Sequence, residues 1–485
     1  MNMKENLIRI VGEGNFSDSP EILEAFSKDF SSTPRGMPHY SVKPKDVNEA
    51  QEIIKLANET QTPVVPCSSA VHFYGNTIPK EGGIILNLTR MNKILEIDEE
   101  NRRVRIEPGV TWQMIEDELG KQDLRVIPPL LPHPQRSVLT DYLEGDFPLI
   151  PIYEYGEPIE GCQVVWANGD IFRTGSASAP GYPNGPAKGT NPEGPGINFV
   201  WLLHHAQGTM GTVSWANIKM EYMPRTNKTF FITFDNIEDA IEPVYRIQRL
   251  RIGQECLLLN NINLATILAE DFSKEFDGLR NILPSWTLIL ILSGTRRRPE
   301  EKIAYHERAL IKLNKQEFPK AVISTSLPGV PGAGTKLLGM LRKSWQDEAI
   351  YWKHRYKGLS QDLFFITKMA LAPRFIEAIE KIAVKHGYPV ADIGAYFQPV
   401  EQGRACHLEF NFYYDPENIQ EVNRIAELYS EAAKIVLNMG AIFERPYGIL
   451  SDLVYDRTAS YTMALKRIKK VFDPNNIMNP GNLCF

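Results

Sequence analysis

The stretch "PVVPCSSAVHFYGNTIPKEGGIILNL", Pro63 to Leu88, decides the fold, because two strand-forming runs flank a loop of small, polar and aromatic residues. A loop with little side-chain bulk lets backbone N–H groups approach an anion closely. The small or compact positions in this loop are Cys67, Ser68, Ser69, Ala70 and Gly75. The stretch therefore predicts either a phosphate-binding loop or a plain connector between two buried strands.

The segments around this loop predict an α+β block. Upstream, "KDVNEAQEIIKLANET" places Val47, Ala50, Ile54 and Ala57 on one helical face, so a helix leads into the strand at "TPVVP". Downstream, "GGIILNL", "KILEID" and "RRVRIEPG" are typical of strands, and "TWQMIEDELGKQ" is typical of a helix.

A second block runs from Arg136 to Pro224. Its strands in "GCQVVWANGDIFRTG" are joined by Asn168-Gly169, a hairpin signal. Residues 176–196 are rich in glycine and proline, which predicts an irregular surface loop. "QGTMGTVSWANIKMEYMP" then predicts a glycine turn followed by a strand.

From about Arg225, helical and strand patterns alternate, which predicts an α/β unit with an antiparallel sheet. "GVPGAGTK", from Gly329, misses the Walker spacing and is interpreted as a flexible loop. The last segment predicts an amphipathic helix that ends at Asp473-Pro474.

Composition limits the classes of function. The chain has 485 residues, 43% of them hydrophobic, and a formal charge of -6, which disfavours a nucleic-acid surface and favours a small ligand. No apolar run is long enough for a signal peptide or a membrane span, so we expect a soluble, cytoplasmic protein. The five cysteines are far apart and form no CxxC pair, which argues against an iron–sulfur cluster or a structural zinc site.

The order of the segments resembles the flavoprotein family of vanillyl-alcohol oxidase and p-cresol methylhydroxylase. The shared elements are the loop from Cys67, "ILNLTRMNKILEID", "RIEPGVTW", "GCQVVWANGDIFRTG", "QGTMGTVSWANIKM" and "FDPNNIMNPG". The resemblance implies an α+β fold in which a PCMH-type FAD-binding domain of two α/β subdomains joins a cap domain, an antiparallel sheet covered by helices. It implies residues 1–225 for the first, 226–450 for the second, and a C-terminal segment, 451–485, that returns to the FAD domain.

The same resemblance implies FAD as the cofactor, with the first loop around its pyrophosphate. The implied cofactor residues are Pro66, Cys67, Ser68, Ser69, Ala70, Val71, His72, Gly75, Gly208, Gly211, Val213, His407 and Asn479. His407 and His72 are the candidates for a covalent link to the flavin; His204 and His205 are not expected to take part. The chain departs from the family between Arg136 and Pro158, where acidic and aromatic residues replace the usual small ones.

The phenol-oxidising branch of the family implies the catalytic candidates. Tyr74 matches a phenolate-binding tyrosine and Arg445 the arginine of a C-terminal Tyr-Arg pair. Glu444 stands where that tyrosine is expected, and Tyr447 is a substitute for it. A carboxylate beside a phenolate is repulsive unless it is protonated or paired with the arginine.

The same C-terminal stretch also resembles the D-2-hydroxyacid dehydrogenases of the glycolate oxidase type. Their metal-binding histidine strand is reduced here to His407, so we expect no metal. Three hypotheses follow: an FAD-dependent oxidoreductase for an alcohol or hydroxylated aromatic, a D-2-hydroxyacid dehydrogenase, and a non-catalytic or electron-relay subunit. We also expect a small-molecule substrate, a homo-oligomer and an electron-accepting partner subunit.

Overall fold

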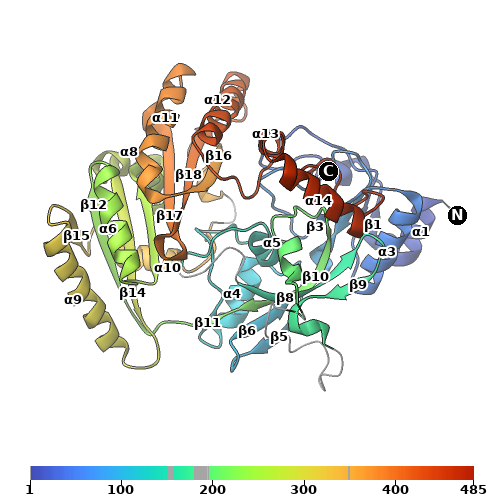
Figure 1. Ribbon diagram of the computed structural model, residues 1–485, viewed down its shortest axis with the longest axis horizontal. Helices are drawn as coiled ribbons and strands as arrows, with labels where there is room; N and C mark the ends of the chain where they lie inside the picture. Colours follow the sequence, from blue (N-terminus) through green and yellow to red (C-terminus); the bar gives the residue numbers. More distant parts are fainter. Residues whose placement is uncertain (1, 151–157, 180–193, 195, 348–349) are drawn as a thin grey trace.

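The computed structural model describes residues 2–150, 158–179, 194, 196–347 and 350–485. They form two lobes that lie side by side, with the N-terminal lobe at the right of Figure 1. The N-terminal lobe contains a four-stranded and a five-stranded sheet, and the other lobe contains a seven-stranded sheet. The predicted α+β fold class is confirmed.

The four-stranded sheet has the order β1-β2-β4-β3 and carries the first loop. Its strands are β1 (Phe16–Ser17), β2 (Tyr40–Val42), β3 (Val64–Cys67) and β4 (Ile84–Asn87). Strands β2, β4 and β3 are parallel, and α3 (Val47–Thr60) precedes β3, as predicted. The carboxylate of Asp46 caps α3 by accepting from the backbone N–H groups of Asn48 and Glu49. The short helices α1 (Met3–Val11) and α2 (Pro20–Glu24) complete this part of the lobe.

The five-stranded sheet is antiparallel, in the order β5-β6-β10-β8-β9. Its strands are β5 (Ile94–Asp98), β6 (Arg103–Ile106), β8 (Ile159–Trp166), β9 (Ile171–Arg173) and β10 (Gly211–Lys219). Gly169, at φ 83°, forms the predicted turn between β8 and β9. Beside the sheet lie α4 (Trp112–Gly120) and the pair β7 (Leu124–Arg125) and β11 (Glu221–Tyr222). Most of the predicted loop at 176–196 lies outside the described residues.

The seven-stranded sheet is antiparallel throughout and buried on both faces. In sheet order its strands are β15 (Val322–Ser324), β12 (Thr226–Phe234), β14 (Trp286–Gly294), β13 (Glu255–Asn260), β17 (Ile393–Val400), β18 (Ala405–Tyr414) and β16 (Leu359–Thr367). Along β13, Cys256 and Leu258 enter one core cluster while Leu257 and Leu259 enter another. Because successive side chains point to opposite faces, such a strand is apolar at every position.

Helices cover both faces of this sheet. One face carries α6 (Glu238–Arg249), α9 (Pro299–Glu317), α11 (Ala372–Lys385) and α12 (Ile419–Asn438). The other carries α7 (Asn261–Leu268), α8 (Phe272–Ile282) and α10 (Ala333–Met340). The interpretation of "GVPGAGTK" as a flexible loop is wrong from Ala333 onward, where α10 begins. Leu337 of this helix is buried, and Nζ of Lys336 donates to the carbonyl of Leu268 at 2.7 Å. These contacts hold α10 in place although glycine disfavours a helix.

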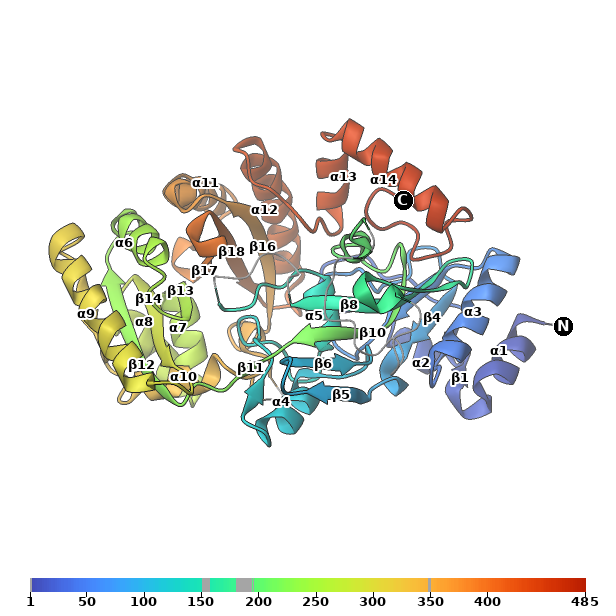
Figure 2. The same ribbon diagram turned by 60° about the horizontal axis from the view of Figure 1, so that its bottom comes forward.

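The C-terminal segment lies on the N-terminal lobe. Figures 1 and 2 both show α13 (Ile449–Tyr455) and α14 (Ala459–Phe472) there, beside the C-terminus. The N–H of Val64 donates to the carbonyl of Ile477 at 2.7 Å, and the N–H of Asn479 donates back to Val64 at 2.9 Å. The domain boundaries at 225 and 450 stay a prediction.

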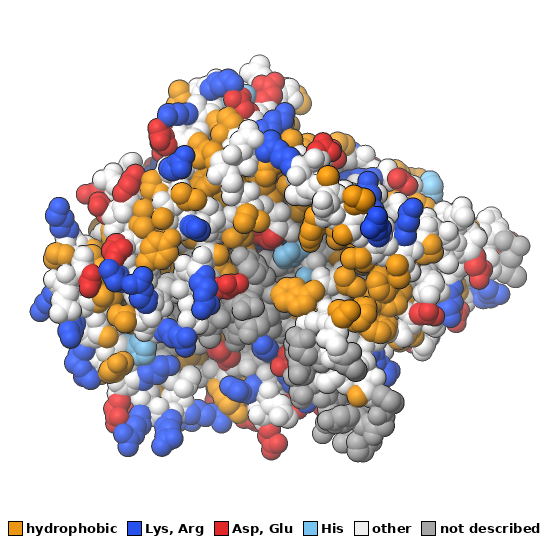
Figure 3. Space-filling model, in the orientation of Figure 1, with side chains coloured by type: hydrophobic (Ala, Val, Ile, Leu, Met, Phe, Trp, Pro, Cys, Tyr) orange, Lys and Arg blue, Asp and Glu red, His pale blue; other side chains and the backbone are white. Residues whose placement is uncertain are grey.

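The surface around α13 and α14 carries hydrophobic side chains (Figure 3). Tyr461 and Val471, for example, are 65% and 74% exposed. Within the part of the chain that the structure describes, no helix has both the length and the apolar character to cross a membrane.

Candidate active site

The loop after β3 folds back around the carbonyl oxygen of Ser69. Nε2 of His72 lies 2.8 Å from this oxygen, and Sγ of Cys67 lies 3.2 Å from it. Because a carbonyl only accepts, Nε2 carries the proton and Nδ1 presents its lone pair. Nδ1 is buried without a hydrogen-bond partner, and burial lowers the pKa of His72 to about 4. His72 is therefore neutral at pH 7.

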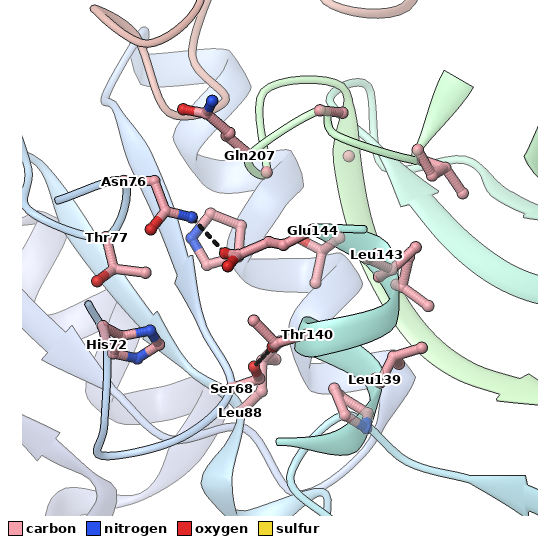
Figure 4. A pocket seen from close by; sticks show the side chains of 18 residues that line it. Ser68, His72, Asn76, Thr77, Leu88, Leu139, Thr140, Leu143, Glu144 and Gln207 are labelled. Atoms are coloured by element: carbon pink, nitrogen blue, oxygen red, sulfur yellow. Dashed lines mark hydrogen bonds between the residues drawn. The ribbon is translucent and has the colours of Figure 1, made fainter. Parts of the chain in front are cut away.

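A cavity of about 690 Å³, counting its opening to solvent, lies between this loop and the turn before β10 (Figure 4). Six predicted cofactor residues line it: Pro66, Ser68, His72, Gly208, Gly211 and Val213. Gly208 has φ +71°, and a Cβ there would lie 3.2 Å from the ring of Pro66. We refer to this space as the cofactor cavity.

Except for His407, the other predicted cofactor residues lie in the first loop or contact residues that line this cavity. Cys67, Ser69, Val71 and Gly75 are buried within the loop, whereas Ala70 is exposed. Asn479 reaches the cavity from the C-terminal segment, where its Nδ2 donates to the carbonyls of Gln207 at 2.6 Å and Asn76 at 2.7 Å. The structure thus brings the loop, the glycine turn and Asn479 together at one site.

The segment that departs from the resembling family forms the opposite wall. Helix α5 (Val138–Leu143) begins at Ser137, whose Oγ accepts from the N–H of Thr140, and Leu139, Thr140 and Leu143 line the cavity. Glu144 follows the helix and accepts a hydrogen bond from Nδ2 of Asn76 at 2.5 Å, drawn dashed in Figure 4. The carboxylate side chain therefore meets the first loop across the cofactor cavity. Residues 151–157 of this segment lie outside the described residues.

A second cavity of about 540 Å³ lies beyond α5, and we refer to it as the substrate cavity. Its lining includes the predicted residues Tyr74, Arg445 and His407. Five more charged side chains that sequence reasoning did not single out line it as well: Arg136, Asp141, Asp146, Lys353 and Glu409. His407, predicted to contact the cofactor, thus lines the substrate cavity; its covalent role stays a prediction.

The catalytic candidates form one cluster, from which Tyr74 and Arg445 line the substrate cavity. The rings of Tyr74 and Tyr447 are stacked, with centroids 4.6 Å apart and an interplanar angle of 15°. The guanidinium carbon of Arg445 lies 6.0 Å from the Tyr74 ring centroid. The hydroxyl of Tyr447 is buried without a hydrogen-bond partner. Two phenol rings and one cation thus form a single cluster.

Glu444 does not stand free beside this cluster. Its Oε1 lies 3.6 Å from Nε of Arg445, and burial raises the pKa of the Glu444 carboxyl. Glu444 is therefore paired with Arg445, which is one of the two conditions under which a carboxylate is not repulsive beside a phenolate.

Two buried arginines neutralise the acidic residues of the departing segment. Arg136 pairs with Asp141 and with Glu144, the latter at 2.6 Å. Arg445 pairs with Asp146 and also donates to the carbonyl of Glu144 at 3.3 Å. Burial raises the pKa of Asp146, but Arg445 and Arg136 outweigh it and hold that pKa below its usual value. Asp146 is therefore ionised beside a charged Arg445.

The lining of the substrate cavity also includes members of a second ion cluster. Nζ of Lys353 lies 2.6 Å from both Asp362 and Glu409, and Nε2 of His407 lies 3.5 Å from Glu409. Among the described residues, no group of three or more His, Cys, Asp or Glu side chains is placed to hold a metal ion.

His204 and His205 lie beside the cofactor cavity, between Leu203 and Ala206, which line it. Burial lowers the pKa of His204 to about 4, and its Nδ1 has no hydrogen-bond partner. Between pH 6.5 and pH 4, His204 is protonated in the unfolded chain but stays neutral in the folded protein. The free energy of unfolding therefore decreases as the pH falls through this range.

We expect His204→Gln to reduce this acid sensitivity. Between pH 7 and pH 5 the wild type should lose about 2 kcal/mol more free energy of unfolding than the variant. Urea unfolding of both proteins at the two pH values measures the difference. An equal loss in both proteins would mean that His204 is already protonated, or exposed, in the fold.

Comparison with known proteins adds to this geometry. Residues 38–138 match the FAD binding domain, and residues 223–483 match the C-terminal domain of FAD linked oxidases, more than half of the chain. The chain belongs to the FAD-linked oxidase family. It is an FAD-dependent oxidoreductase with the PCMH-type fold.

Relatives that match this FAD-linked oxidase over nearly its whole length agree with the family, and so does the solved structure of a similar protein. The chain is 27% identical to glycolate oxidase subunit GlcD of Bacillus subtilis (strain 168), over 99% of this chain and 96% of the relative. It is 23% identical to the 4-cresol dehydrogenase [hydroxylating] flavoprotein subunit of Pseudomonas putida, over 92% and 87%. The structure of 4-ethylphenol oxidase from Gulosibacter chungangensis superposes with a TM-score of 0.84 at 19% identity, over 99% and 96%.

The residues of the cofactor cavity fit FAD. Buried polar atoms without a hydrogen-bond partner surround the space where a polar ligand belongs, and each costs free energy unless a ligand satisfies it. They are Nδ1 of His72, Oδ1 of Asn76, Oγ1 of Thr212 and Oδ1 of Asn479. The small residues of the first loop and Gly208 leave room for close approach of the backbone. Of these polar groups, sequence reasoning missed Asn76 and Thr212, although both lie inside stretches that it quoted.

Proposed function

We propose that this FAD-linked oxidase removes a hydride from a hydroxylated aromatic alcohol or a 4-alkylphenol. When bound, FAD supplies the hydride acceptor. The observation that carries the proposal is the cluster of Tyr74, Tyr447 and Arg445, of which Tyr74 and Arg445 line the substrate cavity. Two phenol hydroxyls and a guanidinium together suit the oxygen of a phenol that loses its proton, and the resulting phenolate gives up hydride more readily than the neutral phenol.

Each residue of the cluster has a distinct part in this proposal. The hydroxyl of Tyr447 lacks a partner in the protein, so it is available to hydrogen-bond the substrate oxygen. Arg445 supplies positive charge, and Asp146 fixes the orientation of its guanidinium. Burial raises the pKa of Tyr74, so its hydroxyl keeps its proton and acts as a donor.

The D-2-hydroxyacid alternative is favoured by one observation and opposed by another. In its favour, the chain resembles GlcD along its whole length, and Nη1 of Arg136 has no hydrogen-bond partner. Against it, the three cations that line the cavity, Arg136, Lys353 and Arg445, all pair with protein carboxylates. A substrate carboxylate would meet no excess of positive charge there.

Anaerobic mixing with candidate substrates separates the two activities. We expect 4-hydroxybenzyl alcohol to bleach the visible flavin absorbance at least about 100-fold faster than D-lactate, because a site built to hydrogen-bond the phenol rejects compounds that lack it. 4-Methoxybenzyl alcohol is the matched control, since it keeps the ring and the alcohol and loses the phenol proton. Rapid bleaching by D-lactate alone would favour the hydroxyacid dehydrogenase.

An electron-relay role, as a flavoprotein subunit of a larger complex, is the remaining proposal. It is motivated by Glu144 and α5, which stand where the resembling family has small residues. A chain that takes up FAD but is not bleached by any of the three alcohols would support it. The electron-accepting partner subunit and the homo-oligomer stay predictions.

A further inference from the structure

Gln207 connects the cofactor cavity with the segment that carries the catalytic candidates. Its side chain is 6% exposed, lines the cofactor cavity, and donates from Nε2 to the carbonyl oxygen of Pro446 at 2.9 Å. Pro446 stands between Arg445 and Tyr447 in the chain. One buried hydrogen bond therefore joins the glycine turn to a residue 239 positions away.

The backbone of Gln207 is held from the other side of the cavity. Its carbonyl accepts the hydrogen bond from Asn479, whose amide also donates to the carbonyl of Asn76. Asn76 in turn lines the cavity and donates to Glu144. In Figure 4, Gln207 lies above Asn76 and Glu144. A continuous chain of hydrogen bonds thus runs from the first loop to Pro446.

The turn that presents Gln207 has an uncommon backbone. His205 and Gln207 have φ values of 57° and 51°, in the left-handed region that side chains other than glycine rarely adopt. Such conformations persist only where the surroundings fix them, and they gather at functional sites. Here the N–H of His205 donates to the carbonyl of Leu143, the last residue of α5, at 2.7 Å. The turn is therefore fixed by the cavity wall on one side and by Asn479 on the other.

We propose that Gln207 is a positioning residue through which FAD in the cofactor cavity orders the segment from Arg445 to Tyr447. A ligand that fills the cavity restricts the side chain of Gln207, and Gln207 then holds the carbonyl of Pro446. The orientation of Arg445 and Tyr447 toward substrate follows from that contact. The part of the proposal that concerns phenols rests on the proposed function, whereas the ordering of the segment does not.

Hydrogen exchange measures the ordering without any substrate. The peptide containing residues 443–451 is compared with and without FAD in the wild type, in Gln207→Leu and in Ser451→Ala. Ser451 is the matched control, because its Oγ donates to the same carbonyl at 2.8 Å but comes from α13 and not from the cavity. We expect FAD to protect the peptide in the wild type and in Ser451→Ala, and not in Gln207→Leu.

Two results would overturn the proposal: protection of Gln207→Leu equal to that of the wild type, or no FAD-dependent protection in the wild type. If Gln207→Leu does not fold, Gln207→Asn takes its place, since it keeps an amide but shortens its reach by one methylene.

A second measurement separates the hydrogen bond from mere packing. In Gln207→Glu, a protonated acid donates to the Pro446 carbonyl, whereas an ionised acid repels it. The probe is phenol, which has no benzylic hydride to lose and so does not reduce the flavin. On acidification, the affinity of the FAD-bound Gln207→Glu variant for phenol should rise about fivefold relative to Gln207→Leu, which corresponds to one hydrogen bond. A flat profile would contradict the positioning role. If phenol does not bind even to the wild type, the proposed function fails, and hydrogen exchange still decides the role of Gln207.

Discussion

Replacing Arg445 by methionine is expected to lower kcat/KM for 4-hydroxybenzyl alcohol by about 10²–10³-fold, the usual cost of removing one donor aimed at developing charge. The guanidinium stands beside both stacked tyrosines, so its charge is available to a phenol oxygen that becomes negative. Methionine keeps much of the packing against Phe364, whose ring centroid lies 4.4 Å from the guanidinium carbon. Steady-state kinetics with FAD-saturated protein measures the effect.

The buried partner of Arg445 requires a control. Arg445→Met leaves the Asp146 carboxylate without its ion pair, which by itself destabilises the fold. The double variant Arg445→Met with Asp146→Asn removes that charge, so we expect it to regain stability but not activity. Arg445→Lys keeps the charge but loses the planar guanidinium, so we expect it to retain intermediate activity. Recovery of activity in the double variant would show that Arg445 acts only by neutralising Asp146.

The sequence predicted the parts of the fold in which local pattern and tertiary packing agree. The run "WTLILILSG" lies in β14, where Leu288 and Leu290 enter one core cluster and Ile289 enters the other. The hairpin at Asn168-Gly169 needed only the conformational freedom of Gly169. These signals are contained within a few residues, so no knowledge of distant contacts was required.

Pairing between distant residues was outside the reach of sequence reasoning. The acidic residues after Arg136 were recognised as a departure, but nothing local shows that Asp146 meets Arg445, 299 positions away. In the same way, no motif surrounds Lys353. Its ion pairs with Asp362 and Glu409 form only because the sheet brings these residues beside it. Buried ion pairs depend on the register of the whole fold, and a single sequence does not contain that register.

Helix α10 is the opposite case, because a local signal predicted a loop where the fold contains a helix. Glycines at 332 and 334 favour a loop by propensity, yet Leu337 packs beneath β12 and the chain turns helical from Ala333. Propensities of about 1 kcal/mol per glycine are smaller than the gain from burying a leucine, about 1.5–3 kcal/mol. Of the site residues that came from the resemblance, Tyr74 and Arg445 line the substrate cavity, and their roles stay predictions.

Lys469→Met is expected to destabilise the protein by about 3–5 kcal/mol, because it leaves a buried carboxylate without its cation. Nζ of Lys469 lies 2.6 Å from Asp473 and 3.0 Å from the carbonyl of Met478, and it also donates to the carbonyl of Thr209. Thr209 belongs to the turn that lines the cofactor cavity, so the variant should also bind FAD less tightly. Urea unfolding and FAD titration of the same preparation measure both effects.

The neighbouring residue provides a matched control for this prediction. Lys470 is exposed on the same helix, so Lys470→Met should change the free energy of unfolding by no more than about 0.5 kcal/mol. The double variant Lys469→Met with Asp473→Asn removes the stranded charge, and it should recover part of the stability. Asp473 also accepts from the N–H groups of Ile477 and Met478, which an asparagine oxygen satisfies only in part. A Lys469→Met protein as stable as Lys470→Met would mean that the C-terminal segment is not anchored through this lysine, and that FAD affinity depends on Asn479 and the glycine turn alone.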